Sequence, residues 1–284
     1  YFRSKLMTIK VVTDSGCDIP RDICEELDIT VVPLTVTFGS TSYQDGVDLS
    51  ADEFYERLVG GSIMPTTSQP SVGSFVETYS KLRESADQLL SIHVSSKLSG
   101  TLNSASQAVA QENLSDSVQL VDSQAASMGL GFSVMAAAEA VKQGSSLEEA
   151  TAAAYSVLQR TELFILFDTL KYLEKGGRIG KASALLGSVL QLKPILTLEN
   201  GEIATKAKIR TFRKGIQSLE QLSQECGNLE NVAVLYTTDA GYATSLAEQI
   251  GQSSNTPLVV RISPAIGTHG GPGVIGIVCV KSEI

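Results

Sequence analysis

The chain has 284 residues, of which 43% are hydrophobic and 19% charged, a composition that excludes an intrinsically disordered protein. Two domains are expected, because this length exceeds the roughly 100–200 residues of one usual core. The formal net charge is −9, so the chain as a whole repels phosphate backbones and anionic membrane surfaces, and binding to nucleic acid is not expected.

The N-terminus, the lack of a long apolar run and the cysteines favour a cytoplasmic protein. Tyr1–Leu6 are interpreted as residues left from cloning, with Met7 as the natural start. The N-terminus lacks the apolar segment of a signal peptide. No run reaches the roughly 18 apolar residues that span a bilayer, so stable membrane insertion is not expected. Four cysteines without C-x-x-C spacing indicate reduced thiols rather than disulfides or a zinc site.

Strands and helices alternate through the first half of the chain. Short β-branched runs predict strands over 9–13, 29–38, 88–94 and 118–121. Helices are expected over 21–27, 50–58, 74–83, 102–111, 127–142 and 146–160, with capping boxes that begin at Ser50 and Ser146. Because this alternation is typical of parallel βαβ units, residues 7–162 are predicted to form an α/β domain of three layers, with a parallel sheet between helices.

The second half predicts another α/β domain, residues 163–284, with a mixed sheet. Its expected elements are a strand over 162–167, a helix over 170–190, a hairpin that turns at Asn200-Gly201, helices over 212–226 and 242–251, and strands over 232–237, 258–262 and 274–281. The fold class is therefore α/β, with two α/β domains and a ligand expected between them.

The common catalytic motifs are missing. The segment Lys175–Ala182 resembles a phosphate-binding loop but has Lys175 where a glycine and Ala182 where a serine or threonine is required. A single glycine follows the first strand, where a dinucleotide fingerprint needs several. With only His93 and His269 in the chain, a centre of several histidines is excluded. No metal or organic cofactor is expected.

Four polar clusters instead follow predicted strands or begin predicted helices: Asp14-Ser15, Thr66–Gln69, Ser95-Ser96 with Ser99–Thr101, and Gly267–Gly271. Ligands bind at this edge of open α/β sheets, so the clusters can share one crevice. Each hydroxyl alone could equally cap a helix. His93 lies inside an apolar strand and is interpreted as a core residue, whereas His269 lies among glycines in a predicted loop. Together the clusters predict an anion site made of neutral donors, suited to a carboxylate or a phosphate.

Several segments in the same order resemble the DegV family, from about residue 9 to the last strand. These segments are IKVVTDSGCDIP, VVPLTVTFGSTSYQDGVDLSADEFYERL, PTTSQPS, SIHVSSKLSGTLNSA, DTLKYLEKGGRIGKASALLGSVLQLKPIL and IGTHGGPG. The resemblance implies two α/β domains around a single long-chain fatty acid. It also implies that the chain is the acyl-carrying subunit of a bacterial fatty-acid kinase in phospholipid metabolism. The ATP-dependent partner kinase would phosphorylate the bound carboxylate to an acyl phosphate, so this chain is expected to have no catalysis of its own.

The resemblance also assigns residues to the ligand. The carboxylate is expected to meet Thr66 or Thr67, with Thr67 preferred, and Ser95 or Ser96, with Ser96 preferred, together with Thr268 and His269. Arg178 is expected to face the ligand, the partner or the domain interface. The apolar tunnel is expected to include Gly129, Phe132, Leu185, Leu186 and Val189.

Two other functions remain open from the residues alone. One is a phosphotransferase or acyl-transfer enzyme that uses the GTHGGPG loop as an anion cradle, with His269 as the base. The other is a small-molecule sensor that regulates a second protein. The absence of a Walker lysine and of a metal-binding carboxylate cluster counts against the enzyme.

Overall fold

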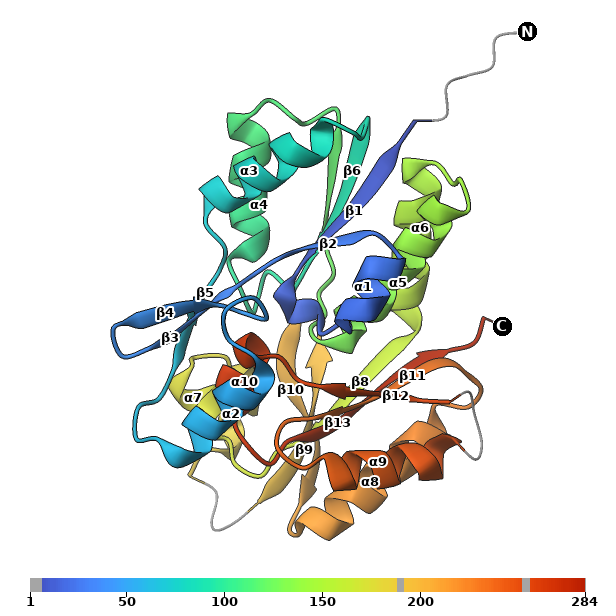
Figure 1. The fold of residues 1–284 in the computed structure, drawn as a ribbon. Coiled ribbons are helices and arrows are strands. Elements are labelled where there is room, and N and C mark those ends of the chain that lie inside the picture. The colour runs from blue at the N-terminus through green and yellow to red at the C-terminus, as the bar shows by residue number, and fades with distance from the viewer. Residues whose placement is uncertain (1–6, 188–191, 252–255, 284) are drawn as a thin grey trace, which may run out of the picture.

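Two α/β domains follow one another along the long axis of the molecule (Figure 1). The computed structural model describes residues 7–187, 192–251 and 256–283, so the interpretation of Tyr1–Leu6 lies outside the described residues. One domain contains a parallel sheet and the other a mixed sheet, which confirms the predicted fold class. The predicted boundary falls just inside strand β8, which directly follows helix α6, and the division into 7–162 and 163–284 remains a prediction.

The N-terminal domain is built on a four-stranded parallel sheet in the order β2-β1-β6-β7. Its strands are β1 (Ile9–Asp14), β2 (Ile29–Val32), β6 (Gln88–His93) and β7 (Val118–Asp122). Helices α3 (Val72–Arg83) and α4 (Thr101–Gln111) cover one face. The other face carries α1 (Arg21–Glu26), α5 (Met128–Lys142) and α6 (Leu147–Arg160), while η1 (Ser15–Cys17) follows β1. The three predicted layers are therefore present.

The C-terminal domain is built on a six-stranded mixed sheet in the order β10-β9-β8-β13-β11-β12. Its strands are β8 (Thr161–Leu166), β9 (Lys193–Glu199), β10 (Glu202–Ile209), β11 (Leu229–Tyr236), β12 (Leu258–Arg261) and β13 (Ile275–Lys281). Helices α8 (Phe212–Glu225) and α9 (Ala240–Gly251) pack on one face of the sheet. The predicted hairpin at Asn200-Gly201 is confirmed by antiparallel pairing of β9 with β10.

A small third sheet of β4-β3-β5 lies beside the C-terminal domain (Figure 1). It consists of β3 (Thr35–Phe38), β4 (Thr41–Gln44) and β5 (Thr66–Ser68), and α2 (Ala51–Gly60) connects the last two strands. Close by lie the short helices α7 (Lys171–Lys175) and α10 (Pro264–Gly270), and η2 (Gly180–Leu185) follows α7. Segments from both halves of the sequence thus meet in this region.

Three sequence predictions about elements were wrong. The single strand expected over 29–38 is two strands of different sheets, separated at Pro33, which has no N–H for a sheet ladder. The long helix expected over 170–190 ends at Lys175, because Gly177 and Gly180 adopt positive φ of 69° and 52°. The predicted glycine loop around His269 is instead the helix α10, which begins with Pro264 in its first turn.

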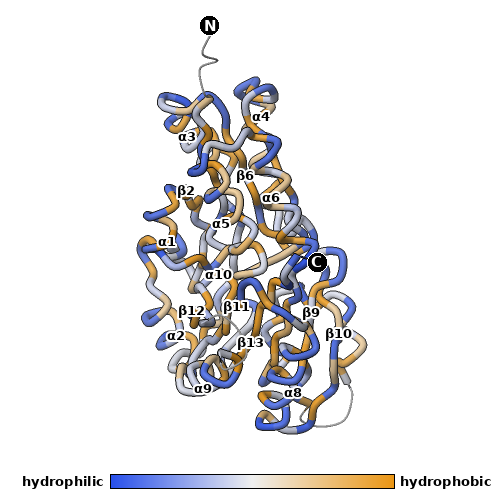
Figure 2. Tube along the Cα trace, turned by 90° about the vertical axis from the view of Figure 1, so that its right-hand side faces the viewer, coloured by the Kyte–Doolittle hydropathy of each residue, from blue (hydrophilic) through white to orange (hydrophobic). Residues whose placement is uncertain are grey.

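Hydrophobic residues follow the interior strands, and the outer loops are largely hydrophilic (Figure 2). Both predicted capping boxes are present, with Ser50 and Ser146 each accepting from the backbone N–H three residues on, at 3.3 Å. Each cap contributes about 1 kcal/mol to helix stability. Within the described ranges, no helix combines the length and apolar character that crossing a bilayer requires.

Candidate functional site

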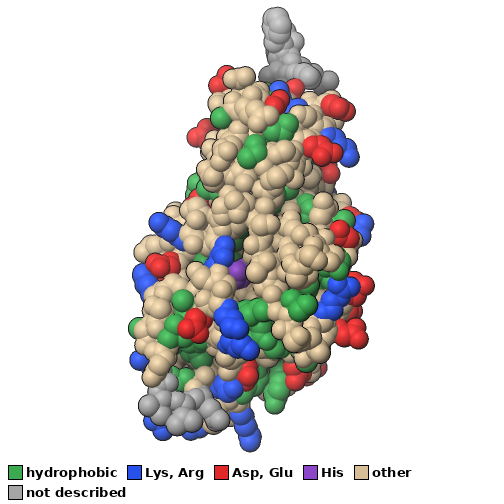
Figure 3. Space-filling view, turned by 90° about the vertical axis from the view of Figure 1, so that its left-hand side faces the viewer, with side chains coloured by type: hydrophobic (Ala, Val, Ile, Leu, Met, Phe, Trp, Pro, Cys, Tyr) green, Lys and Arg blue, Asp and Glu red, His purple; other side chains and the backbone are tan. Residues whose placement is uncertain are grey.

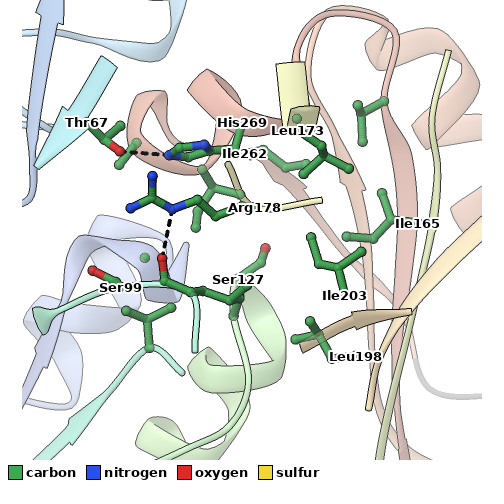
Figure 4. A pocket seen from close by; sticks show the side chains of 18 of the residues that line it. Thr67, Ser99, Ser127, Ile165, Leu173, Arg178, Leu198, Ile203, Ile262 and His269 are labelled. Atoms are coloured by element: carbon green, nitrogen blue, oxygen red, sulfur yellow. Dashed lines mark hydrogen bonds between the residues drawn. The ribbon is translucent and has the colours of Figure 1, made fainter. Parts of the chain in front are cut away.

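A cavity lies between the domains, at the edge where the parallel strands end. Residues after β1, β6 and β7 form its wall on the N-terminal side, and β8, β9, β10 and α10 form the opposite wall. Its volume is about 980 Å³, including open solvent at its mouth. Polar side chains gather at one end around Thr67, His269 and Arg178, and apolar side chains fill the other end around Ile165, Leu198 and Ile203 (Figure 4).

Thr67 and His269 form a hydrogen-bonded pair at the polar end, with 2.7 Å between Thr67 Oγ1 and His269 Nε2. Thr67 is the central residue of β5, opposite Val36 of β3, so the small sheet fixes its position. His269 lies in the last turn of α10. The two residues are 202 positions apart in the sequence and meet only because both chain segments fold over the cavity.

The imidazole of His269 is packed tightly and is neutral near pH 7. Burial, helped by the positive charge of Arg178, lowers the pKa of His269 to about 4. A Cβ on Gly176 would lie 2.2 Å from Nδ1, so only glycine allows the ring this position. Among the described residues, Nδ1 is buried without a hydrogen-bond partner. With the proton on Nε2, the ring donates to Thr67 Oγ1 and leaves the threonine O–H free for an anion.

Arg178 brings a half-buried positive charge to the same end of the cavity. Its Nε donates to Leu98 O at 3.1 Å and its Nη1 donates to Gly176 O at 2.7 Å. In Figure 4 the guanidinium lies between the Thr67–His269 pair and Ser99. The site is therefore not made of neutral donors alone, and the sequence reasoning underestimated Arg178.

This arrangement suits an amphipathic anion. One cation, one threonine hydroxyl, one neutral imidazole and the hydroxyl of Ser99 surround the polar end, and a carboxylate can accept from the cation and the two hydroxyls. The remaining wall also contains Ser68, Gln69, Ser127 and Thr197 but is mostly apolar, with Val94, Leu98, Leu163, Ile165, Phe167, Leu173, Leu196, Leu198, Ile203, Ile262, Ile266 and Val274. In the described part of the chain, no three His, Cys, Asp or Glu side chains are grouped to hold a metal ion.

Residues 8–282 match the sequence profile of a protein family, which is described as "Uncharacterised protein, DegV family". This chain belongs to the DegV family. A DegV domain-containing protein of Streptomyces coelicolor is 37% identical over 278 residues, which cover 95% of this chain and 97% of that relative.

Solved DegV-family structures superpose on nearly the whole chain. A Thermus thermophilus DegV family protein, described by its fatty acid binding, has a TM-score of 0.90 at 35% identity and covers 97% of this chain and 100% of its own. A stearic acid-binding protein of Eubacterium ventriosum has a TM-score of 0.88 at 28% identity, with 96% and 98% covered.

In this DegV-family chain, the threonines expected at the carboxylate have different positions. Thr67 lines the cavity, whereas Thr66 is exposed. Thr268 is buried, and its hydroxyl donates to Pro264 O of the same helix at 2.9 Å. Thr66 and Thr268 do line a second, open hollow just outside the polar end, together with Thr67, Lys175, Arg178 and His269.

The structure brings neither Ser95 nor Ser96 to the cavity wall. Ser96, the preferred candidate, is exposed, and its Oγ donates to Asp122 Oδ2 at 2.5 Å. Ser95 is fully buried and donates to Gly201 O of the hairpin turn at 2.7 Å. Ser99 of the same loop lines the cavity instead, with its Oγ 2.8 Å from Thr101 Oγ1. From the sequence, Ser99 belonged to the polar cluster with Ser95 and Ser96 and was also a possible helix cap, but it was not among the residues assigned to the carboxylate.

None of the described residues predicted for the tunnel lines this cavity. Phe132 and Leu185 are buried in the core, and Leu186 is exposed. Gly129 lines a different hollow at the far end, and Val189 lies outside the described residues. The apolar wall comes largely from strands, with Leu163, Ile165 and Phe167 at alternate positions of β8 and just after it.

The glycines around His269 serve packing. A Cβ on Gly267 would lie 2.3 Å from Tyr55 Oη, and a Cβ on Gly271 would lie 2.2 Å from the ring of Tyr172. These glycines allow α10 to approach two aromatic side chains closely. Of the GTHGGPG segment that the enzyme hypothesis used as an anion cradle, residues 267–270 form the end of the packed helix α10.

The polar end of the cavity opens toward a basic surface. Lys175, Arg178 and His269 line the hollow next to the polar end. Figure 3 shows Lys and Arg side chains beside a histidine on one face of the molecule. The chain is acidic overall, so this surface stands out locally.

Proposed function

We propose that this chain binds one long-chain fatty acid in the cavity and presents its carboxylate to an ATP-dependent partner kinase in the cytoplasm, which converts it to an acyl phosphate. The observation that carries the proposal is one cavity whose polar end offers Thr67, Arg178 and Ser99 as donors and whose remaining wall is mostly apolar. The fatty-acid binding stated for the Thermus thermophilus relative supports it.

The carboxylate would lie at the polar end. Thr67 O–H and the guanidinium of Arg178 are the donors best placed for it, and Ser99 adds a third. His269 would act by orienting Thr67, since its Nε2 already contacts the threonine oxygen. Each charge-assisted hydrogen bond contributes roughly 1.5–3 kcal/mol, so the head of the ligand sets its orientation.

The alkyl chain would supply most of the affinity. At ~0.8 kcal/mol per buried CH₂, fifteen methylenes contribute ~12 kcal/mol before ordering costs. The apolar side chains of β8, β9 and β10 favour a hydrocarbon over a polar metabolite in this volume. The affinity and the orientation of the ligand would therefore come from opposite ends of one cavity.

The open hollow outside Thr67 and His269 supports presentation to a partner. In the proposed reaction a carboxylate oxygen attacks the γ-phosphorus of ATP, ADP leaves, and the acyl phosphate remains bound. Lys175 and Arg178 line the hollow and would favour the approach of phosphate groups. The catalytic groups would belong to the kinase, and this chain would be its carrier rather than an enzyme.

Variants of the polar end test the binding mode. Thr67→Val and His269→Gln are expected to weaken binding of palmitate roughly tenfold to a hundredfold, because each disturbs a charge-assisted hydrogen bond. Ser96→Ala is the matched control, since that hydroxyl is exposed and faces Asp122. Hexadecanol, which has no carboxylate, should bind wild type and the three variants with equal affinity. Equal palmitate affinity in all of them would contradict this site.

A separate measurement tests the carrier role. The isolated chain, loaded with fatty acid and given ATP and Mg²⁺, is expected to form no acyl phosphate. Turnover of ATP or acyl transfer by the isolated chain, lost in Thr67→Val and His269→Gln, would instead make the chain an enzyme.

A further inference from the structure

Ser95, predicted at the carboxylate, joins the two domains instead. Its side chain is fully buried, and its Oγ donates to Gly201 O at 2.7 Å. Ser95 follows β6 of the N-terminal domain, and Gly201 is in the turn between β9 and β10 of the C-terminal domain. The hydrogen bond therefore ties the tip of a hairpin to the opposite domain.

The hairpin tip fits closely against that domain. Asn200 and Gly201 have φ of 52° and 79°, as a two-residue hairpin turn requires. A Cβ on Gly201 would lie 2.4 Å from Ser95 Oγ and 3.3 Å from the Cα of Gln124. Only glycine at position 201 thus combines the turn with this contact.

The same hairpin forms part of the cavity wall. Leu198 precedes the turn, Ile203 follows it, and both line the cavity. The loop after β6 is held at a second point, where Arg178 Nε donates to Leu98 O at 3.1 Å. The C-terminal domain therefore forms two hydrogen bonds with this loop, one near the polar end and one at the hairpin tip.

An open hollow lies beside the hairpin tip. Asn200, Gly201 and Gln124 line it, and it shares Leu163, Thr197 and Leu198 with the cavity. The cavity and the hollow therefore adjoin at these shared residues. Movement of the hairpin tip away from Ser95 would join the two spaces.

We propose that the Ser95–Gly201 hydrogen bond is a latch, and that its release opens the apolar end of the cavity for entry and exit of the acyl chain. This inference rests on the proposed fatty-acid binding. It assigns the two ends of the cavity separate tasks: the polar end presents the carboxylate, and the hairpin end exchanges the ligand.

Two variants break the latch from opposite sides. Ser95→Ala removes the donor, and Gly201→Ala places a methyl group against Ser95 Oγ. Ser96→Ala is the matched control in the same loop, with no contact to the hairpin in the hydrogen bonds of the described residues. Each protein is loaded with labelled palmitate, and the rate of its loss to excess unlabelled palmitate is measured. Amide hydrogen exchange of residues 198–203 is measured without ligand.

Ser95→Ala and Gly201→Ala are expected to release palmitate on the order of tenfold faster than wild type and Ser96→Ala, and to exchange hairpin amides faster. In the double variant the rate of palmitate release should rise by less than the product of the two single increases, because both changes act on one contact. If Ser95→Ala loads palmitate normally, releases it at the wild-type rate and, without ligand, exchanges its hairpin amides at the wild-type rate, the latch alone would be overturned. Faster amide exchange in a protein that binds no palmitate would overturn the proposed function, and with it the role of the latch.

Discussion

At the scale of residues, two buried carboxyl groups lie behind the cavity wall. Asp45 is 3% exposed, and burial raises its pKa to about 7. Ser15, Ser263 and the Ala265 amide lie near enough to favour its charged form, yet neither oxygen forms a hydrogen bond of good geometry with a described residue. Burial also raises the pKa of Asp18 to about 6, despite its hydrogen bonds from Ser127 and Ser263.

Asp45 gives the protein a predictable dependence on pH. Because the pKa of Asp45 is higher in the folded state, the folded protein binds a proton there that the unfolded chain has already released. This proton stabilises the fold at low pH, and the stabilisation is lost as the pH rises through about 7. The unfolding free energy of wild type should therefore fall from pH 5 to pH 8 by roughly 2 kcal/mol more than that of Asp45→Asn, which cannot ionise at this position. Urea titrations at both pH values measure it.

Asp116→Asn, a change in an exposed turn, is the control for the lost charge. His269 acts in the opposite direction, because its lowered pKa removes stability as the pH falls from about 6.5 to about 4. Wild type and Asp45→Asn both contain His269, so its effect cancels in their difference. A difference between Asp45→Asn and wild type that is the same at pH 5 and pH 8 would contradict the prediction.

At the scale of elements, two glycines of α5, Gly129 and Gly131, differ in how closely their surroundings pack against them. Glycine in a helix costs about 1 kcal/mol relative to alanine, so both positions need a packing reason. A Cβ on Gly131 would lie 2.7 Å from Cys17 O and 2.9 Å from Met128 Sδ. A Cβ on Gly129 would meet only Ala125 Cβ at 3.6 Å and Thr161 Cγ2 at 3.8 Å, which are ordinary contacts.

Alanine at these two positions should have opposite effects. Gly131→Ala is expected to lower the unfolding free energy by about 1–3 kcal/mol, because the backbone of η1 cannot move away cheaply. Gly129→Ala should raise it by up to about 1 kcal/mol. Denaturant unfolding of both variants compares them directly. Stabilisation by both substitutions would mean that α5 and η1 are not closely packed.

The apolar wall shows why the sequence could not predict the cavity. Leu163 and Ile165 of β8 face the cavity, while Phe164 and Leu166 pack into the core beneath α8 and α9. Both faces of the strand are buried and apolar, so no alternation marks the side that meets a ligand. The capping boxes and the Asn-Gly turn depend on neighbouring residues, and these were predicted correctly.

At the scale of the whole molecule, the sequence predicted two α/β domains and a site at the edge where the parallel strands end. It could not predict which hydroxyl of each pair faces inward. Thr67 lines the cavity because β5 pairs with β3, a contact between distant segments, and Ser99 replaces Ser96 because Asp122 holds Ser96 outside. The position of Arg178 depends on the turn at Gly176-Gly177, which ends the long helix expected there.

Fatty-acid binding can be tested by mass spectrometry of an organic extract from the purified protein, with a native mass of the unextracted sample. We expect one long-chain fatty acid per chain, present in the extract and matching the excess native mass. An extract without lipid, together with a bound nucleotide or phosphorylated metabolite in the native mass, would refute fatty-acid binding and favour an enzyme at the hollow around Thr67, Arg178 and His269.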